Sequence, residues 1–451
     1  MKKSLSIQIH LAACLLLIVA DSGYGAESGL TLEEALRLAS RHDASIYQAS
    51  LEVESGDALV REAYSAALPR LDMSGSLTHF MQAPSSYIPA FDERVRFAPL
   101  YNASGALQLA QPLWLAGKIG LALDAAKVYR LIARDGLSNA KSRLKAEVIR
   151  EYYGLLLARE VVRVSEESLA QAARHSESVG QMYEVGVASE FDLLRSQVQV
   201  KALEPELSAA RKGAELAAVA LKNRLGLPPD GELLLVDELD AERAVVEAVD
   251  AQWAYQRAVE QRAEFRILDR QERLNDIGLK VQQHSLYWPN FYLGVGYSQE
   301  AGQDKLDALK EGSTWAGSAT WTLSAAIPLF DGFATQARIQ QARIGLRKTE
   351  LARRQVSDGV RLEVTAALAE LRRAGEQLAS ARSAVELAEK AHTIALASYE
   401  AGVGTELEVL DAQLAMRAAK LGMLQGFYDQ RVAEAEYRRV VENDDVLPEE
   451  R

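Results

Sequence analysis

The sequence of 451 residues is poor in the residue types that mark several classes of protein. Its single cysteine, Cys14, excludes a disulfide framework and any cluster of thiolate ligands. Its formal net charge of −12 lacks the basic excess that binding to nucleic acid requires. Its six histidines are scattered, and no nucleotide-binding loop or G-x-S-x-G nucleophile motif occurs. The sequence therefore predicts no enzyme activity, no cofactor, no metal site and no nucleic-acid partner.

Long apolar runs are also absent, except at the start of the chain. Two lysines precede an apolar run from Leu11 to Ala20, and small residues follow, so residues 1–25 predict a secretory signal peptide. The residues up to Cys14 resemble a lipobox as well, which leaves acylation of Cys14 open, although six more apolar residues follow it. Beyond residue 25 no run of 18 apolar residues occurs, so we expect no membrane-spanning helix.

What the sequence does contain is a long internal repeat. The stretches YEVGVASEFDLLRSQV, from Tyr183, and YEAGVGTELEVLDAQL, from Tyr399, are identical at seven of sixteen positions and lie 216 residues apart. Pro112 and Pro328, in QPLW and IPLF, have the same offset. Two copies of one unit therefore make up most of the chain. The predicted boundaries are a first repeat over 26–225, a linker over 226–248, a second repeat over 249–442 and a tail over 443–451.

Each copy predicts the same order of elements. A helix of about 37 residues comes first, at 31–67 and 251–287, and two alternating stretches around a polar loop follow it. The alternation predicts strands at about 70–82 and 103–113, and at about 290–300 and 315–328. Helical hairpins with a glycine-bearing turn are predicted over about 116–225 and 334–440. Their first helix, of some 65 residues, would measure roughly 100 Å, far more than a globular domain needs.

The alternating stretches are typical of strands with one apolar and one polar face. From Trp315 to Ser324, Trp, Gly, Ala, Trp and Leu alternate with Ala, Ser, Thr, Thr and Ser. Each stretch has about ten residues, the length of a tilted strand that crosses a bilayer. Aromatic residues near the strand ends suit the two membrane interfaces: Phe80, Trp114, Trp288, Tyr292 and Trp321. A soluble sheet and a long soluble coiled coil would show the same patterns, so both remain alternatives.

Membrane strands in this number would require an oligomer. Four strands cannot close a barrel, and lipid does not tolerate an open sheet edge. Two copies would give eight strands, whose interior is filled by side chains, so an aqueous passage requires at least three copies and twelve strands. The small polar residues of the alternating stretches suit the lining of such a passage.

The duplicated organisation resembles a known family. The secretory signal, the TLEEAL helix start at Thr31, the repeated unit, the QPLW and IPLF strand ends and the YExGVxS/T turns are together similar to the TolC-like outer membrane efflux proteins. The resemblance implies an α+β membrane protein, with four transmembrane strands per chain completing a 12-stranded β-barrel in a homotrimer. It also implies a long α-helical tunnel that extends from the outer membrane into the periplasm.

The resemblance also implies a function and partners. The expected role is an outer membrane channel, the exit duct of a tripartite efflux or type I secretion system that exports small molecules or proteins. The expected partners are outer membrane lipids, a periplasmic adaptor (membrane fusion) protein and an inner-membrane pump. A periplasmic coiled-coil adaptor or a structural protein is the alternative, but an adaptor would require only one helical hairpin per chain.

The repeated turn is predicted to be the tip of each helical hairpin. Its glycine supplies the permissive backbone that a tight turn between helices needs. Ser189 with Asp192, and Thr405 with Glu408, have the spacing of capping boxes. Asp411 lies three residues after Glu408 and shares its helix face, although no cap requires it.

The resemblance assigns roles to residues of this turn. Glu408 and Asp411 match an acidic ring at the periplasmic entrance, and Tyr399 and Asp192 match a pair that constrains the closed tip. The best-known family pattern has a basic residue at the position of Gly404, so a constraint here would rest on Tyr399 and Asp192. The residues expected in the tip turns and in adaptor docking are Tyr183, Gly186, Val187, Ser189, Gly402, Val403 and Thr405.

Overall fold

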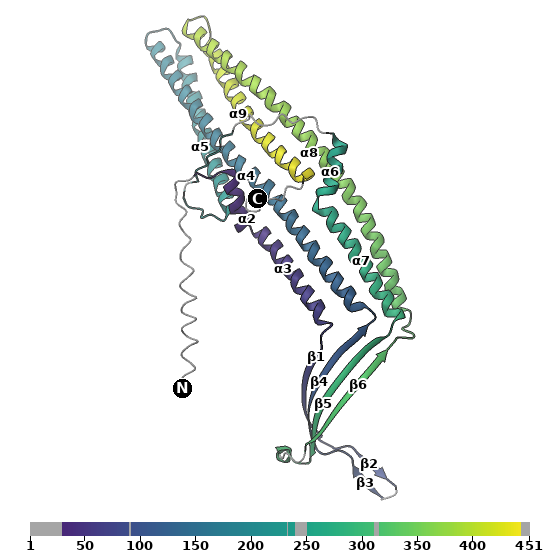
Figure 1. Ribbon diagram of the computed structural model, residues 1–451. Coiled ribbons are helices and arrows are strands. Elements are labelled where there is room, and N and C mark those ends of the chain that lie inside the picture. The colour runs from purple at the N-terminus through teal and green to yellow at the C-terminus, as the bar shows by residue number, and fades with distance from the viewer. Residues whose placement is uncertain (1–28, 90–91, 232, 240–249, 311–314, 443–451) are drawn as a thin grey trace. The chain divides into compact units, whose positions relative to one another are not determined.

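The structure is a computed structural model that describes residues 29–442 except 90–91, 232, 240–249 and 311–314 (Figure 1). The predicted signal peptide with Cys14, most of the second half of the linker and the tail lie outside the described residues. Contacts divide the chain into two compact units, and each unit takes segments from both repeats. The first unit comprises Met1–Ala44, Lys141–Ala254 and Val364–Arg451, and the second comprises Ser45–Ala140 and Tyr255–Glu363.

The second unit contains a four-stranded antiparallel sheet to which both repeats contribute. Its strand order is β1-β4-β5-β6 (Figure 1), with β1 at Arg70–His79, β4 at Tyr101–Leu115, β5 at Asn290–Gln303 and β6 at Ala316–Ala326. The pairing of β4 with β5 joins the two repeats. Within the described chain, β1 and β6 each lack a partner strand on their outer side. The four strands that the alternation predicts are therefore present in one sheet.

The register of this sheet sorts apolar and polar side chains onto opposite faces. One row across the four strands is apolar: Leu71, Leu109, Val295 and Trp321. The row next to it, on the other face, is mostly polar: Asp72, Gln108, Gly296 and Thr320. On the same polar face, hydroxyl pairs link neighbouring strands at 2.8 Å (Ser76 with Ser104) and 2.9 Å (Ser298 with Ser318). The sheet thus has one apolar side and one lined by small polar groups.

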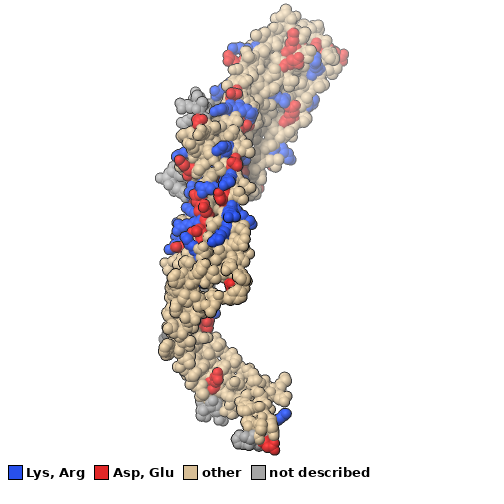
Figure 2. Space-filling model, turned by 90° about the vertical axis from the view of Figure 1, so that its right-hand side faces the viewer, with Lys and Arg blue, Asp and Glu red and all other residues tan. Residues whose placement is uncertain are grey.

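Charged residues are scarce in the sheet. The strands contain Arg70, Asp72 and Glu300, and β4 and β6 contain none. Figure 2 shows Lys, Arg, Asp and Glu side chains gathered over the helices and few over the strands. Among the described helices, none is both long and apolar enough to span a membrane.

The loop between β1 and β4 contains a second hairpin that the sequence did not predict. Its strands are β2 at Ser85–Ile88 and β3 at Glu93–Arg96. The loop after β5 includes a short 3₁₀ helix at Leu306–Lys310. Asp304 in this second loop accepts hydrogen bonds from the Leu100 amide, at 3.1 Å, and from the Arg96 guanidinium. The two loops, one from each repeat, are therefore tied together.

The first helix of each repeat is broken, which corrects the prediction of single helices of about 37 residues. The observed pairs are α2 (Leu32–His42) with α3 (Ala44–Ser65), and α6 (Ala251–Gln261) with α7 (Ala263–Tyr287). The backbone is extended at Asp43 and Arg262, between the paired helices. Asp43 accepts a hydrogen bond from Arg224 at 3.3 Å, and Arg262 pairs with Glu363 at 2.6 Å. Asp43 and Arg262 are buried, their partners are partly exposed, and each pair links a helix break to a distant part of the chain.

The helical hairpins are the longest elements. They consist of α4 (Lys118–Glu184) with α5 (Glu190–Leu225), and α8 (Ala334–Glu400) with α9 (Glu406–Tyr437), which ends in a π-helical turn at Arg438–Glu442. Both α4 and α8 have 67 residues, close to the predicted length. Polar contacts such as Arg211 with Glu166, at 2.7 Å, and Lys420 with Glu389, at 3.2 Å, join the two helices of each hairpin. Both hairpin tips lie in the first unit.

Candidate functional site

The two hairpin tips have the same hydrogen-bonded turn. In each, the glycine amide donates to the tyrosine carbonyl at 2.9 Å, Gly186 to Tyr183 and Gly402 to Tyr399. The two glycines have φ angles of 77° and 74°, in the left-handed region where an L residue is strained. A helix that ends in such a turn needs a residue that tolerates a positive φ. This requirement explains why both repeats have glycine at this position.

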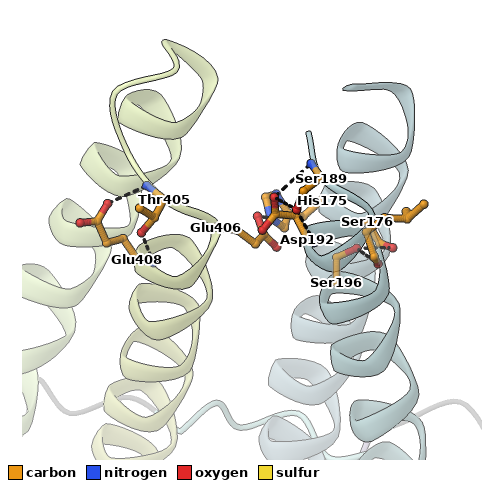
Figure 3. A network of polar contacts seen from close by, with 9 residues as sticks. His175, Ser176, Ser189, Asp192, Ser196, Thr405, Glu406 and Glu408 are labelled. Carbon is orange, nitrogen blue, oxygen red and sulfur yellow. Dashed lines mark hydrogen bonds and ion pairs between the residues drawn. The ribbon is translucent and has the colours of Figure 1, made fainter. Parts of the chain in front are cut away.

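Both helices that leave the tips begin with a capping box (Figure 3). The Ser189 amide donates to the Asp192 carboxylate, and the Asp192 amide donates to the Ser189 hydroxyl, each at 3.2 Å. The Thr405 amide donates to the Glu408 carboxylate at 2.8 Å, and the Glu408 amide donates to the Thr405 hydroxyl at 3.4 Å. The boxes that the sequence spacing predicts are thus present in both repeats.

A buried polar pair lies beside the second tip and joins the repeats. The Nε2 atom of His175, in α4, lies 2.8 Å from Oε2 of Glu406, the first residue of α9. The two side chains are 6% and 2% exposed. An ionised carboxylate only accepts, so the bond to such a group requires the tautomer of His175 that carries a proton on Nε2. The ring of Tyr399 packs against the imidazole, with ring centres 5.7 Å apart.

Tyr399 lies close to two carboxylates. Burial, and then the charges of Glu406 and Asp192, raise the pKa of the Tyr399 hydroxyl above its ordinary value. The hydroxyl therefore keeps its proton at neutral pH and remains a donor. The expected partner Asp192 is near enough to act on Tyr399 through its charge, while its carboxylate accepts hydrogen bonds from Ser189.

The two acids of the expected entrance ring are exposed. Glu408 lies in the first turn of α9 and uses its carboxylate in the capping box. Asp411 lies one turn further and is exposed as well. The apolar residues of both tips are also exposed, with Val187 at 74% and Val403 at 82%.

The His175–Glu406 pair is the feature of the site that sequence reasoning missed. Its members are separated by 231 residues, and neither belongs to a recognised motif. The repeat offered one clue, because Glu190 and Glu406 occupy the same position of the two turns. In the part of the chain that the structure describes, no group of three His, Cys, Asp or Glu residues is arranged to hold a metal ion.

The fold and the tips define a class of protein, one whose two repeats build a shared two-sided sheet and two long helical hairpins. The chain belongs to the outer membrane efflux protein family, whose model matches residues 35–227 and 282–441. It is an outer membrane efflux protein, located in the outer membrane. The family resemblance expected from the sequence is thereby confirmed.

Individual relatives agree with this assignment. The chain is 26% identical to Protein CyaE of Bordetella pertussis over 397 residues, which cover 85% of this chain and 78% of that protein. It is 24% identical to the outer membrane efflux protein BepC of Brucella suis over 430 residues, 94% and 88% of the two chains. The solved outer membrane protein VceC of Vibrio cholerae has a TM-score of 0.73 at 16% identity, covering 91% of this chain and 95% of that one. The similarity to VceC is a similarity of fold.

Proposed function

We propose that the chain is the exit duct of a tripartite efflux or type I secretion system and exports small molecules or proteins. The observation that carries this proposal is the two-sided sheet, in which both repeats contribute strands and each 67-residue helix follows a strand. An apolar outer face and a small, polar inner face suit a wall between lipid and water. The duct itself performs no catalysis, so the energy for export comes from a partner.

The open sheet edges support a homotrimer. The outer sides of β1 and β6 lack a partner strand within the described chain, and such edges are not tolerated in lipid. Pairing β6 of one copy with β1 of the next, three times, gives a closed barrel of twelve strands. The aromatic residues Trp114 and Trp288, whose ring centres lie 5.6 Å apart, would then lie at the periplasmic interface with the lipids.

The tips provide the proposed entrance and the docking surface for an adaptor. Glu408 and Asp411 would place six carboxylates around the entrance of a trimer, where a ring of acids favours cations and opposes anions. Tyr399 and Asp192 would constrain the same tip. The exposed apolar side chains at the turns, Val187 and Val403 foremost, fit a periplasmic adaptor that connects the duct to an inner-membrane pump.

The first test is purification in mild detergent, with mass determination and planar-bilayer recording. We expect a trimer that gives discrete conductance steps, and a monomer without conductance would refute the duct. The second test is the double variant Glu408→Gln with Asp411→Asn, which should weaken block by cations or raise the conductance at low pH. Glu190→Gln is the matched control, because it removes an exposed acid from the other tip. Identical single-channel behaviour of the wild type, the double variant and Glu190→Gln would refute the acidic ring.

A further inference from the structure

The corner between strand and helix is built differently in the two repeats. In the first repeat β4 continues through Trp114, which pairs with Phe291 of β5 and packs its ring against Trp288. In the second repeat β6 ends at Ala326, and the equivalent residues form a segment outside the strands, residues 327–333. This segment, the corner segment, joins β6 to α8 (Figure 1). It is therefore released from the sheet that holds its counterpart.

The corner segment exposes its apolar side chains. Leu329 is 93% exposed, Phe330 75% and Phe333 64%. The rings of Phe330 and Phe333 lie edge to face, with centres 5.4 Å apart, so they form one apolar surface. The one charged side chain of the segment is bound to the helix, because Asp331 accepts a hydrogen bond from the Thr335 amide of α8 at 2.9 Å. The charge thus holds the start of α8, and the outer surface of the segment is apolar.

Phe333 has a backbone conformation that is unfavourable for phenylalanine. Its φ angle is 66°, in the left-handed region, and its counterpart in the first repeat is a glycine, Gly117, with a φ angle of 74°. A bulky residue at such an angle is strained, and strained positions of this kind cluster at functional sites. The ring of Phe333 is mostly exposed within the described chain. We therefore look outside the chain for the contact that favours phenylalanine over glycine here.

The position of the corner segment indicates what covers it. Trp321 and Leu323 lie on the apolar face of β6, and the alternation of the sequence continues this apolar row to Ile327 and Leu329. In the proposed barrel this face is turned to lipid, whereas the next copy pairs with the edge of β6. The equivalent corner of the first repeat, with Trp114, lies at the periplasmic interface of that barrel. Aromatic side chains are favoured at this depth.

We propose that the corner segment is a lipid anchor. Its side chains Leu329, Phe330 and Phe333 insert among the lipids of the outer membrane leaflet that faces the periplasm. The lipid contact offsets the strain at Phe333, and the bond of Asp331 to α8 keeps that charge away from the lipid. The anchor fixes the depth at which the strands end and the helices begin. It rests on the proposed function, since the apolar face of β6 is turned to lipid only in the proposed barrel.

Collision rates of a nitroxide label measure the depth of the segment directly. Cys14, in the predicted signal peptide, is the single cysteine of the sequence, so Leu329→Cys, Leu323→Cys and Val403→Cys can each be labelled alone. In vesicles of phosphatidylethanolamine and phosphatidylglycerol, molecular oxygen reports lipid and a neutral nickel complex reports water. Leu323 is the lipid reference and Val403 the water reference. The ratio of oxygen to nickel collisions should be about tenfold higher at Leu329 than at Val403, because lipid excludes the polar complex.

Removal of the two rings tests whether they hold the segment in lipid. Phe330→Ala with Phe333→Gly, which introduces the glycine of the first repeat, should lower the collision ratio at Leu329 about threefold. The ratio at Leu323 should stay the same, which shows that the sheet is still in lipid. Phe97→Ala is the matched control, because it removes an exposed aromatic ring from the loop after β3 and should change neither ratio.

The outcomes separate the anchor from the barrel. A ratio at Leu329 as low as that at Val403 would overturn the anchor, because the segment would then lie in water. Low collision rates with both reagents would overturn it as well, since a second copy of the chain would then cover the segment. A low ratio at Leu323 would refute the proposed barrel, whereas a high ratio at Leu323 with a low one at Leu329 refutes the anchor alone. An unchanged ratio at Leu329 after removal of both rings would overturn the role of the aromatic residues.

Discussion

The two hairpin tips of this chain have one local structure and two different surroundings. Both turn through a left-handed glycine, and both start the next helix with a capping box. The acid that follows the capping residue is exposed in the first tip, at Glu190, and buried against His175 in the second, at Glu406. The repeat therefore preserves the geometry of the turn, while the contact that distinguishes the tips comes from α4, outside the turn.

This comparison separates two kinds of information in the sequence. The hydrogen bonds of a turn and of its capping box lie within a few residues, so a repeated motif repeats them. The packing of that turn on a neighbouring helix depends on a residue that differs between the repeats, His175 in α4 and Ala391 in α8. A duplicated chain can thus assign one tip to a role that the other does not have.

The largest expected difference between the tips is in the cost of removing the first-turn acid. Glu406→Ala leaves the buried Nε2 donor of His175 without its partner and should lower the local free energy of unfolding of α9 by about 2 kcal/mol. Glu190→Ala removes an exposed side chain and should change the value for α5 by less than about 0.5 kcal/mol. Native-state hydrogen exchange of the first turns of α5 and α9 measures both. Equal losses of local unfolding free energy in the two variants would show that burial of Glu406 does not stabilise the second tip.

The turn glycines should respond alike, since the turn itself is the same. Gly186→Ala and Gly402→Ala place a side chain at a left-handed φ, and each should lower the free energy of unfolding by about 1.5 kcal/mol. No atom lies within 4 Å of the added Cβ at either position, so strain in the backbone is the whole effect. Gly213→Ala, inside α5 and also without a close neighbour, is the matched control and should increase stability. Thermal unfolding of the three variants compares them, and unequal costs at the tips would contradict the shared turn.

The capping residues should show a smaller and again equal effect. Ser189→Ala and Thr405→Ala each remove one hydroxyl acceptor at a helix start. Each should lower the local free energy of unfolding of that helix start by about 1 kcal/mol. Thr405→Ser keeps the acceptor and should change little. Hydrogen exchange of the first turn of α5 and α9 is the measurement. A cost confined to one tip would mean that its capping box is replaced by another contact.

The sequence was sufficient for most of the fold. The repeat, the alternation of the strands and the long helical hairpins are all regular patterns, and the four-stranded sheet follows from them. The helix breaks at Asp43 and Arg262 were missed because neither proline nor glycine marks them. Ion pairs with residues far along the chain, such as Arg224 with Asp43, stabilise these breaks. No local pattern of the sequence contains that information.

The candidate site was only partly predictable for the same reason. The capping boxes and the glycine turns were readable from spacing within a few residues. The pairing of His175 with Glu406 was not, because an isolated histidine in a long helix has no local feature that specifies its partner. The arrangement of Glu408 and Asp411 around an entrance stays a prediction, since it concerns several copies of the chain.

The smallest expected effect concerns His392 in α8, which has a serine, Ser176, at the equivalent position of α4. Burial, and then the charges of His175 and Lys420, lower the pKa of His392 below its ordinary value of 6.5. Its Nε2 atom is buried without a hydrogen-bond partner, so the folded state favours the neutral ring. The unfolded chain therefore binds more protons as the pH falls below about 6.5, and His392 contributes a loss of stability there. Because the ring is only half-buried, this loss is smaller than those above.

Hydrogen exchange of α8 around His392 at pH 7.5 and 5.5, corrected for the intrinsic effect of pH on exchange, measures this loss. Protection should decrease at the lower pH in the wild type and decrease less in His392→Gln, which cannot titrate. The segment of α4 around Leu155 serves as the internal reference, because Leu155 is buried and the segment, unlike that around His175, contains no histidine. A loss of equal size in the wild type and in His392→Gln would assign the pH dependence to other groups.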